Sequence, residues 1–163
     1  MSELSIKRID GRNWERWAPT VIKTMRMVFP RELWWSKRTF ENGMRDERYI
    51  ARLGTVNDEF TGFSFGMVHD DHKKQGLVPN ELNIIHFFDL FVIPRYQFHG
   101  YGYAMFSDFV TQAKVHKYDM LTGCAREGPS LKNVRKFPIR EIEARINYYK
   151  TGETYIFFAL NLK

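Results

Sequence analysis

The sequence has 163 residues, 44% of them hydrophobic, and a formal net charge of +6 from 25 basic and 19 acidic side chains. This length suits one domain with a sizeable core, and no linker-like composition divides it, so we expect a single domain over residues 1–163. The one cysteine, Cys124, excludes an intramolecular disulfide, and no uncharged run is long enough to cross a bilayer. We therefore expect a cytoplasmic protein with no membrane partner.

The N-terminal third predicts one strand followed by helices. Residues 5–9 have the pattern of a short strand. Residues 13–29 carry apolar side chains at helical spacing, but Pro19 would break such a helix in its middle. We therefore expect the regular helix to begin near Pro19, because proline suits the first helical turn. A second helix is expected from Pro30 to a stop at Gly43.

Residues 48–53 and 60–68 predict a β-hairpin, because apolar side chains alternate with small or polar ones in the second run. Residues 70–80 are polar and predict a loop. His69 and His72 bracket two aspartates there, but a polar turn explains this arrangement and no cysteine or histidine cluster supports it. We expect no metal site.

The central stretch, residues 82–115, predicts a strand, a glycine-rich turn and a helix. The apolar run from Ile84 to Ile93 is aromatic and β-branched and stops at Pro94, as a strand does. After Gly102, apolar residues recur at three- and four-residue spacing. Amides at a helix start have no partner inside the helix, and Gly100 and Gly102 would let an anion approach them. The turn therefore predicts a phosphate-binding site or, alternatively, a glycine turn that only joins the strand to the helix.

The C-terminal third predicts two more strand regions around a short helix. Residues 118–125 have strand character, and residues 131–136 predict a short helix after the break at Gly128. Residues 142–149 and 154–162 flank the turn at Gly152 and predict a second hairpin.

The segment from Asp89 to Gly102, DLFVIPRYQFHGYG, resembles the acetyl-CoA-binding motif of the GNAT superfamily of N-acetyltransferases. Gln97, Gly100 and Gly102 form its Q-x-x-G-x-G pattern, whereas Phe98 and His99 stand where Gly and Lys or Arg are usual. The order of predicted elements also resembles that family over nearly the whole chain. The resemblance implies an α/β fold with a mixed, mostly antiparallel central sheet flanked by helices.

The resemblance further implies an acetyl-CoA-dependent N-acetyltransferase, in which an amine attacks the thioester directly. Backbone groups of the central strand would hold the pantetheine arm, the turn amides would hold the pyrophosphate, and the Val92 amide would stabilise the oxyanion. The cofactor-binding residues implied are Phe91, Val92, Gln97, Phe98, His99, Gly100, Tyr101, Gly102 and Tyr103.

Two residues of the same strand are candidate catalytic groups. His86 lies six residues before Val92, where some protein-modifying members of the family carry a Glu base, and an imidazole titrates near neutral pH. A buried histidine bonded to a neighbour is the structural alternative. Asp89 is the second candidate. Its structural alternative is to hold the loop before the following helix, because D-L-x-V is frequent in the family. Residues 126–137 contain no Tyr to act as the usual general acid, which leaves Tyr148 or Tyr149 if they reach the sulfur.

Four tryptophans and the cysteine allow two interpretations each. The resemblance places the region that contains the tryptophans beside the acceptor pocket, although core and surface packing is the better explanation of them. Cys124 has no evident base nearby and is more typical of strand packing than of an acyl-carrying nucleophile. The tryptophans are Trp14, Trp17, Trp34 and Trp35.

The acceptor is open among amines of small metabolites, proteins and aminoacyl-tRNA, and the positive net charge favours an anionic one. A homodimer is a possible assembly. One alternative is a nucleic-acid-modifying or nucleic-acid-binding protein on a GNAT-like fold, because basic residues contact phosphates and aromatic rings stack on bases. Another is a non-catalytic acyl-CoA sensor, which the missing Tyr suggests.

Overall fold

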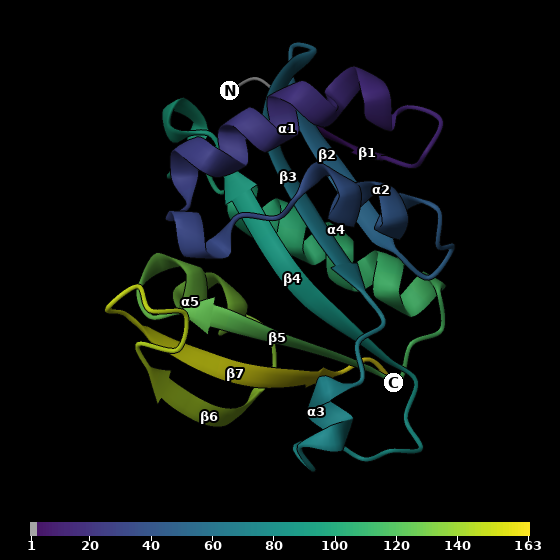
Figure 1. Cartoon of the computed structure of the whole chain (residues 1–163), viewed down its shortest axis with the longest axis vertical. Coiled ribbons are helices and arrows are strands. Elements are labelled where there is room, and N and C mark those ends of the chain that lie inside the picture. The colour runs from purple at the N-terminus through teal and green to yellow at the C-terminus, as the bar shows by residue number, and fades with distance from the viewer. Residues whose placement is uncertain (1–2) are drawn as a thin grey trace.

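The computed structural model describes residues 3–163, except for the side chains of residues 71 and 72, and is built on one seven-stranded sheet (Figure 1). The strand order is β1-β2-β3-β4-β5-β7-β6. Among the described residues, β4 and β5 pair in parallel and every other neighbouring pair is antiparallel, which confirms the predicted mixed sheet. The strands are β1 (Leu4–Arg8), β2 (Ile50–Val56), β3 (Glu59–Met67), β4 (Ile84–Val92), β5 (Met120–Arg126), β6 (Arg140–Ile146) and β7 (Thr154–Asn161).

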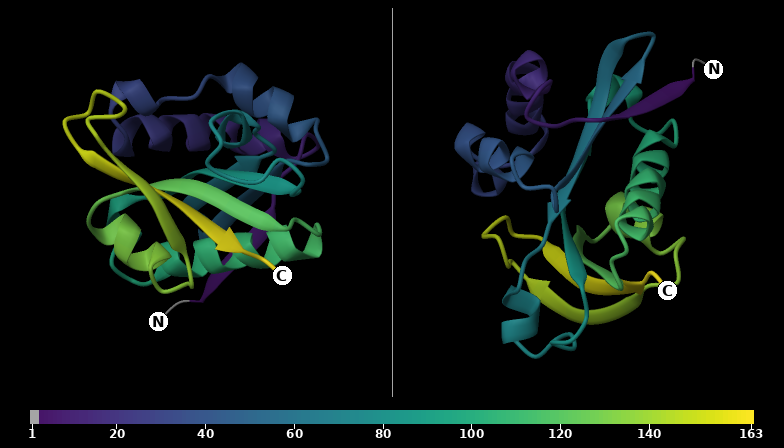
Figure 2. Two further views of the ribbon diagram at one scale, coloured as in Figure 1. Left: turned by 90° about the horizontal axis from the view of Figure 1, so that it is seen from below. Right: turned by 90° about the vertical axis from the view of Figure 1, so that its right-hand side faces the viewer.

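Helices cover both faces of the sheet, so that the sheet is the middle of three layers (Figure 2). One layer contains α1 and α2, whose buried side chains pack on Phe63 and Phe65 of β3. The other contains α4 and α5, which pack on Phe87 of β4 and Phe158 of β7. The helical elements are α1 (Trp14–Val28), η1 (Arg31–Leu33), α2 (Lys37–Met44), α3 (Asp71–Lys74), η2 (Pro94–Tyr96), α4 (Tyr101–Val115) and α5 (Pro129–Val134).

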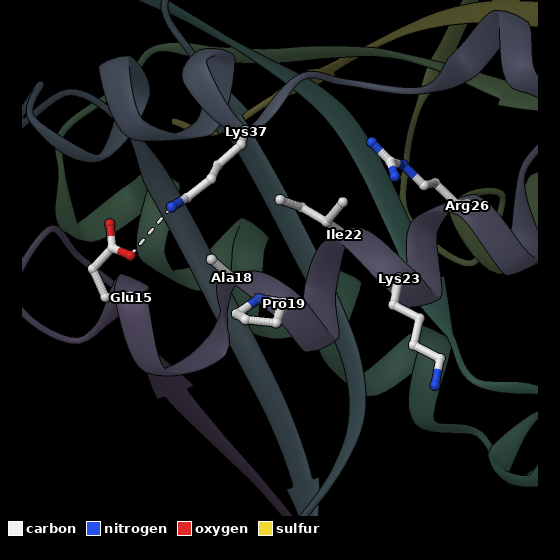
Figure 3. A pocket seen from close by; sticks show the side chains of 7 residues that line it. All are labelled: Glu15, Ala18, Pro19, Ile22, Lys23, Arg26 and Lys37. Atoms are coloured by element: carbon white, nitrogen blue, oxygen red, sulfur yellow. Dashed lines mark hydrogen bonds and ion pairs between the residues drawn. The ribbon is translucent and has the colours of Figure 1, made fainter.

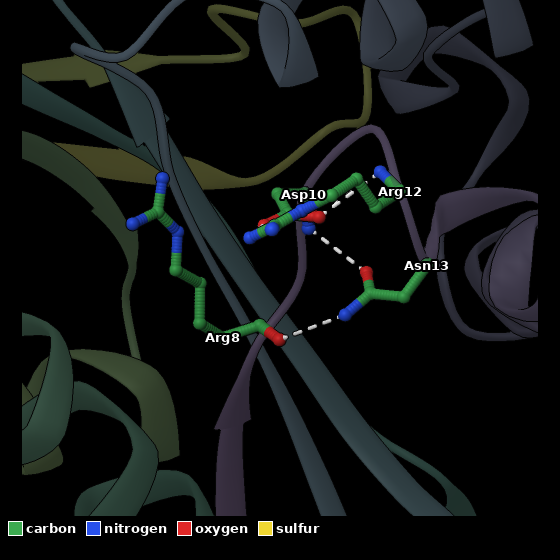
Figure 4. A network of polar contacts seen from close by, with 4 residues as sticks. All are labelled: Arg8, Asp10, Arg12 and Asn13. Carbon is green, nitrogen blue, oxygen red and sulfur yellow. Dashed lines mark hydrogen bonds and ion pairs between the residues drawn. The ribbon is translucent and has the colours of Figure 1, made fainter.

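Helix α1 begins at Trp14 and contains Pro19, so the predicted start near Pro19 was wrong. A polar network fixes the earlier start, because the Asn13 side chain accepts from the Asp10 amide at 2.9 Å (Figure 4). The Trp14 amide also donates to the Asp10 carbonyl. Trp14 and Ala18 are buried against the sheet, whereas Pro19 is exposed. The bond that Pro19 removes therefore lies on the solvent side, where water can satisfy the freed carbonyl.

The single helix predicted from Pro30 to Gly43 is divided. A short 3₁₀ turn, η1, is followed by an extended segment, and α2 begins only after Ser36, whose hydroxyl accepts from the Thr39 amide at 3.0 Å. Ser36 is thus an N-cap, a signal present in the sequence. The extended segment points the indole of Trp35 at Asp89 on β4.

The other elements lie within a few residues of their predicted positions. The first hairpin turns at Asn57 and Asp58, both with positive φ, as a two-residue turn requires. The predicted polar loop contains one helical turn, α3, in which the Lys74 amide donates to the Asp70 carbonyl, so the prediction of a plain loop was wrong there.

Candidate functional site

The strands β4 and β5 separate halfway along their length. They pair only over residues 84–87 and 120–123. The register between β3 and β4 then shifts, because Phe88 is an extra residue opposite the step from Phe65 to Gly66, which is a β-bulge. Beyond the bulge β4 follows β3 while β5 follows β7, and the two strands diverge (Figure 1). This leaves one edge of β4 without a neighbouring strand in the described chain.

A cavity of about 1050 Å³ occupies this divergence. Trp35 lines it from the layer of α1 and α2, and Gly102 and Asn133 line it from the layer of α4 and α5. Asp89 and Val92 line it from β4. The cavity therefore reaches both faces of the sheet, and we call its two parts the α1 side and the α4 side.

Backbone groups of β4 face the gap at alternate residues. The Ile93 amide donates to the Thr61 carbonyl of β3 at 2.9 Å. Since alternate residues of a strand direct their polar groups to opposite edges, Phe91 faces β3, and Leu90 and Val92 face the gap. The Val92 carbonyl accepts from the Gln97 side chain at 2.9 Å, which fastens the following loop to the strand.

The glycine-rich turn has the geometry that its sequence predicts. Gly100 is the N-cap of α4 with φ 81°, a left-handed conformation that favours glycine. The Ala104 amide donates to the Gly100 carbonyl at 3.0 Å, so the amides of Gly102 and Tyr103 precede the first bond of the helix. A Cβ on Gly102 would lie 3.6 Å from Leu90, which shows how closely the helix start approaches β4.

The predicted cofactor residues divide between the cavity and its surroundings. Those that line it are Phe91, Val92, Gln97, Phe98, Gly100 and Gly102. The other three predicted residues, His99, Tyr101 and Tyr103, are not among those that line the cavity. His99 bonds the Gln97 carbonyl at 2.7 Å and stacks on Tyr101, and the Tyr103 ring packs on Phe137. The backbone of the turn, rather than these rings, faces the cavity.

Asp89 lies on the α1 side of the cavity and accepts a hydrogen bond from the indole of Trp35. Burial raises the pKa of its carboxyl from 3.8 to about 7, although the Trp35 bond acts in the opposite direction. A carboxyl with such a pKa exchanges its proton near neutral pH. The bulge at Phe88 and the extended segment before α2 together create this environment, and neither was evident from the sequence.

His86 is buried and lines the same side of the cavity. Its Nδ1 lies 2.9 Å from the Thr122 hydroxyl on β5, and its ring centroid lies 4.6 Å from Phe88 and 5.8 Å from His69. The bond to Thr122 orients the imidazole. This geometry is compatible with both interpretations of His86, a base or a structural residue.

Tyr148 and Tyr149 follow β6 and both line the cavity, as does Cys124 of β5. Burial raises the pKa of Tyr149, and the charge of Asp89 acts in the same direction. Asp89 and Tyr149 are therefore close enough to interact electrostatically. Burial also raises the pKa of Cys124 to about 12, despite a hydrogen bond with Tyr149. The thiol is therefore protonated at neutral pH, which argues against a nucleophilic role.

The four tryptophans have different positions. Trp34 and Trp35 line the cavity. Trp14 is buried against Phe40 at 5.3 Å between ring centroids, and Trp17 packs near Phe60 at 6.5 Å.

A second hollow, of about 340 Å³, lies over the outer surface of α1 and is crossed by an ion pair between Lys37 and Glu15 at 3.3 Å (Figure 3). None of the residues that line this hollow lines the main cavity. In the described part of the chain, no cluster of three or more His, Cys, Asp or Glu residues could hold a metal ion. No helix among the described residues is long and apolar enough to span a membrane.

Comparisons with known proteins show the fold. No family model and no curated protein matches the sequence. The ribosomal-protein-S18-alanine N-acetyltransferase from Escherichia coli is 21% identical with a TM-score of 0.73, over 99% of this chain and 95% of that one. Arabidopsis thaliana NAA60 in complex with acetyl-CoA is 13% identical with a TM-score of 0.78, over 98% of both chains.

An aminoglycoside 6'-N-acetyltransferase complexed with coenzyme A is 12% identical with a TM-score of 0.74, over 98% of this chain and 97% of that one. Identities this low establish a common architecture and not a common substrate. The chain therefore has the GNAT fold that the motif from Asp89 to Gly102 predicted.

Proposed function

We propose that this chain, which has the fold of the GNAT N-acetyltransferases, transfers an acetyl group from acetyl-CoA to an amine. The observation that carries the proposal is the unpaired edge of β4 beside the start of α4. An extended amide-containing arm can pair with such an edge, and a pyrophosphate can bind such a helix start. Both features face the same cavity of about 1050 Å³.

The cofactor would lie on the α4 side. Backbone groups of Leu90 and Val92 would pair with the pantetheine amides, and the amides of Gly102 and Tyr103 would bind the pyrophosphate. Lys132 and Lys136 line the cavity from the region of α5 and would add positive charge for the phosphates.

The reaction would take place where the two sides of the cavity meet. The amine nitrogen forms a bond to the thioester carbon, the carbon–sulfur bond breaks, and the amine's proton leaves to a base. Asp89, with a pKa of about 7, and His86, whose Nδ1 lies beside the Thr122 hydroxyl, are the candidate bases. Tyr149 is the candidate acid for the departing thiolate, because it lines the cavity and burial keeps its phenol protonated at neutral pH.

The α1 side favours an acceptor amine that carries an apolar or aromatic group. Phe29, Trp34, Trp35 and Phe88 line this side, and Asp89 is its partly buried carboxyl. Aromatic faces and a carboxylate attract an ammonium group. An anionic acceptor, which the net charge suggests, stays a prediction to be compared with cationic ones in an acceptor screen.

Calorimetric titration of acetyl-CoA tests the proposal. We expect the wild type to bind and a Gly100→Glu, Gly102→Glu variant to lose binding, because the new carboxylates would occupy and repel the phosphate position. Gly76→Glu is the matched control, since Gly76 also has positive φ and open space but does not line the cavity.

Circular dichroism of all variants would establish that they are folded. Equal losses in the Gly76 control, or no binding by the wild type, would refute the proposal. In the second case, salt-dependent titration with nucleic acid becomes the next measurement, because phosphate contacts weaken steeply with salt.

A further inference from the structure

Phe98 occupies a position that is unfavourable for a phenylalanine. Its φ is 64°, in the left-handed region that bulky side chains avoid, and 93% of its surface is exposed. Folding alone would favour Gly or Asn at this position, since both adopt the conformation easily and neither exposes an apolar ring. The exposed ring therefore needs a functional explanation.

The ring lies at the α4 side of the main cavity. Phe98 lines that cavity with Gly100 and Gly102 of the same turn, and with Pro129 and Lys132 of α5. Gln97 holds the turn to β4 through the Val92 carbonyl, so the backbone that carries the ring is anchored. An exposed aromatic face therefore stands beside the amides that would bind a pyrophosphate.

We propose that Phe98 is the platform on which the adenine of coenzyme A stacks. The proposal rests on the proposed function, because a pyrophosphate at the start of α4 leaves the attached nucleoside close to the rim of the turn. A planar base covers an exposed ring without any hydrogen-bonding requirement, and stacking of a base on an aromatic side chain is a substantial source of affinity. The ring gains on ligand binding the burial that it lacks in the free protein.

Two ligands and two variants test the proposal. The ligands are acetyl-CoA and S-acetyl-4'-phosphopantetheine, which keeps the thioester arm and one phosphate but lacks the adenosine. Phe98→Asn removes the ring and suits the left-handed backbone, so the turn stays formed. Phe98→Tyr keeps an aromatic face. Calorimetry gives the dissociation constant of each pair, and circular dichroism establishes that each variant is folded.

We expect Phe98→Asn to weaken acetyl-CoA binding about tenfold, or about 1.4 kcal/mol, with no change for the shorter ligand. Phe98→Tyr should bind both ligands like the wild type. Unchanged acetyl-CoA affinity in Phe98→Asn, or equal losses for both ligands, would overturn the adenine platform while the acetyl-CoA site stands. Failure of the wild type to bind acetyl-CoA would instead overturn the proposed function and the platform together.

Discussion

The raised pKa of Asp89 predicts how the free energy of unfolding depends on pH, and this prediction can be tested without a substrate. Burial raises this pKa from 3.8 in the unfolded chain to about 7 in the fold. The folded state therefore binds more protons than the unfolded state between these values, and the free energy of unfolding falls as pH rises through this window. At about 1.4 kcal/mol per pH unit, the whole loss is about 4 kcal/mol, of which about 2.5 kcal/mol falls between pH 5 and pH 8.

Asp89→Asn removes this titration while its amide oxygen can still accept from Trp35. We expect the variant to be more stable than the wild type at pH 8, with an advantage about 2.5 kcal/mol larger than at pH 5. Urea unfolding at both pH values measures the difference. Asp119→Asn is the control: Lys163 holds the pKa of Asp119 low, so this carboxylate is ionised in both states throughout that window.

Asp119→Asn should therefore shift stability equally at the two pH values. If Asp89→Asn also shifts stability equally at pH 5 and pH 8, then Asp89 is not held in a proton-retaining environment. The interpretation of this carboxyl as a base near neutral pH would fail with it, because that role depends on the same burial.

Three further predictions concern the glycine-rich turn, the ion pair between Arg52 and Asp108, and the imidazole of His86. Gly100→Ala should lower the free energy of unfolding by about 1 kcal/mol, because its φ is 81°, whereas Gly102→Ala should be near neutral since its Cβ has room; thermal unfolding compares the two. Arg52→Ala should lower the free energy of unfolding by about 2 kcal/mol, because it leaves Asp108 of α4 partly buried and unpaired. Arg126→Ala removes an exposed pair with Glu153 and should lower it by less than about 0.5 kcal/mol. Urea unfolding measures both changes. His86→Ala should lower kcat by about 100-fold and leave acetyl-CoA affinity unchanged if His86 is the base; unchanged turnover would identify it as structural.

The local elements were predictable where one short-range signal dominates. Alternation identified the two hairpins, and the apolar run ending at Pro94 identified β4. Errors arose where tertiary packing decides. The burial of Trp14 on the sheet carries α1 through Pro19. The helix expected after Pro30 is divided for a different reason, because the cap at Ser36 is a local signal that the helical spacing obscured.

For the candidate site, the sequence by itself determined the glycine turn, since glycine adopts the left-handed conformation at Gly100 without strain, and this motif indicated the GNAT fold. Only the tertiary structure decided what surrounds it. The bulge at Phe88 opens the sheet, and Trp35, which lies 54 residues away along the chain, donates to Asp89. Tyr149, 60 residues away, lines the same cavity and senses the charge of Asp89. The pKa of a carboxyl depends on such distant neighbours and on burial, and neither is encoded in local sequence pattern.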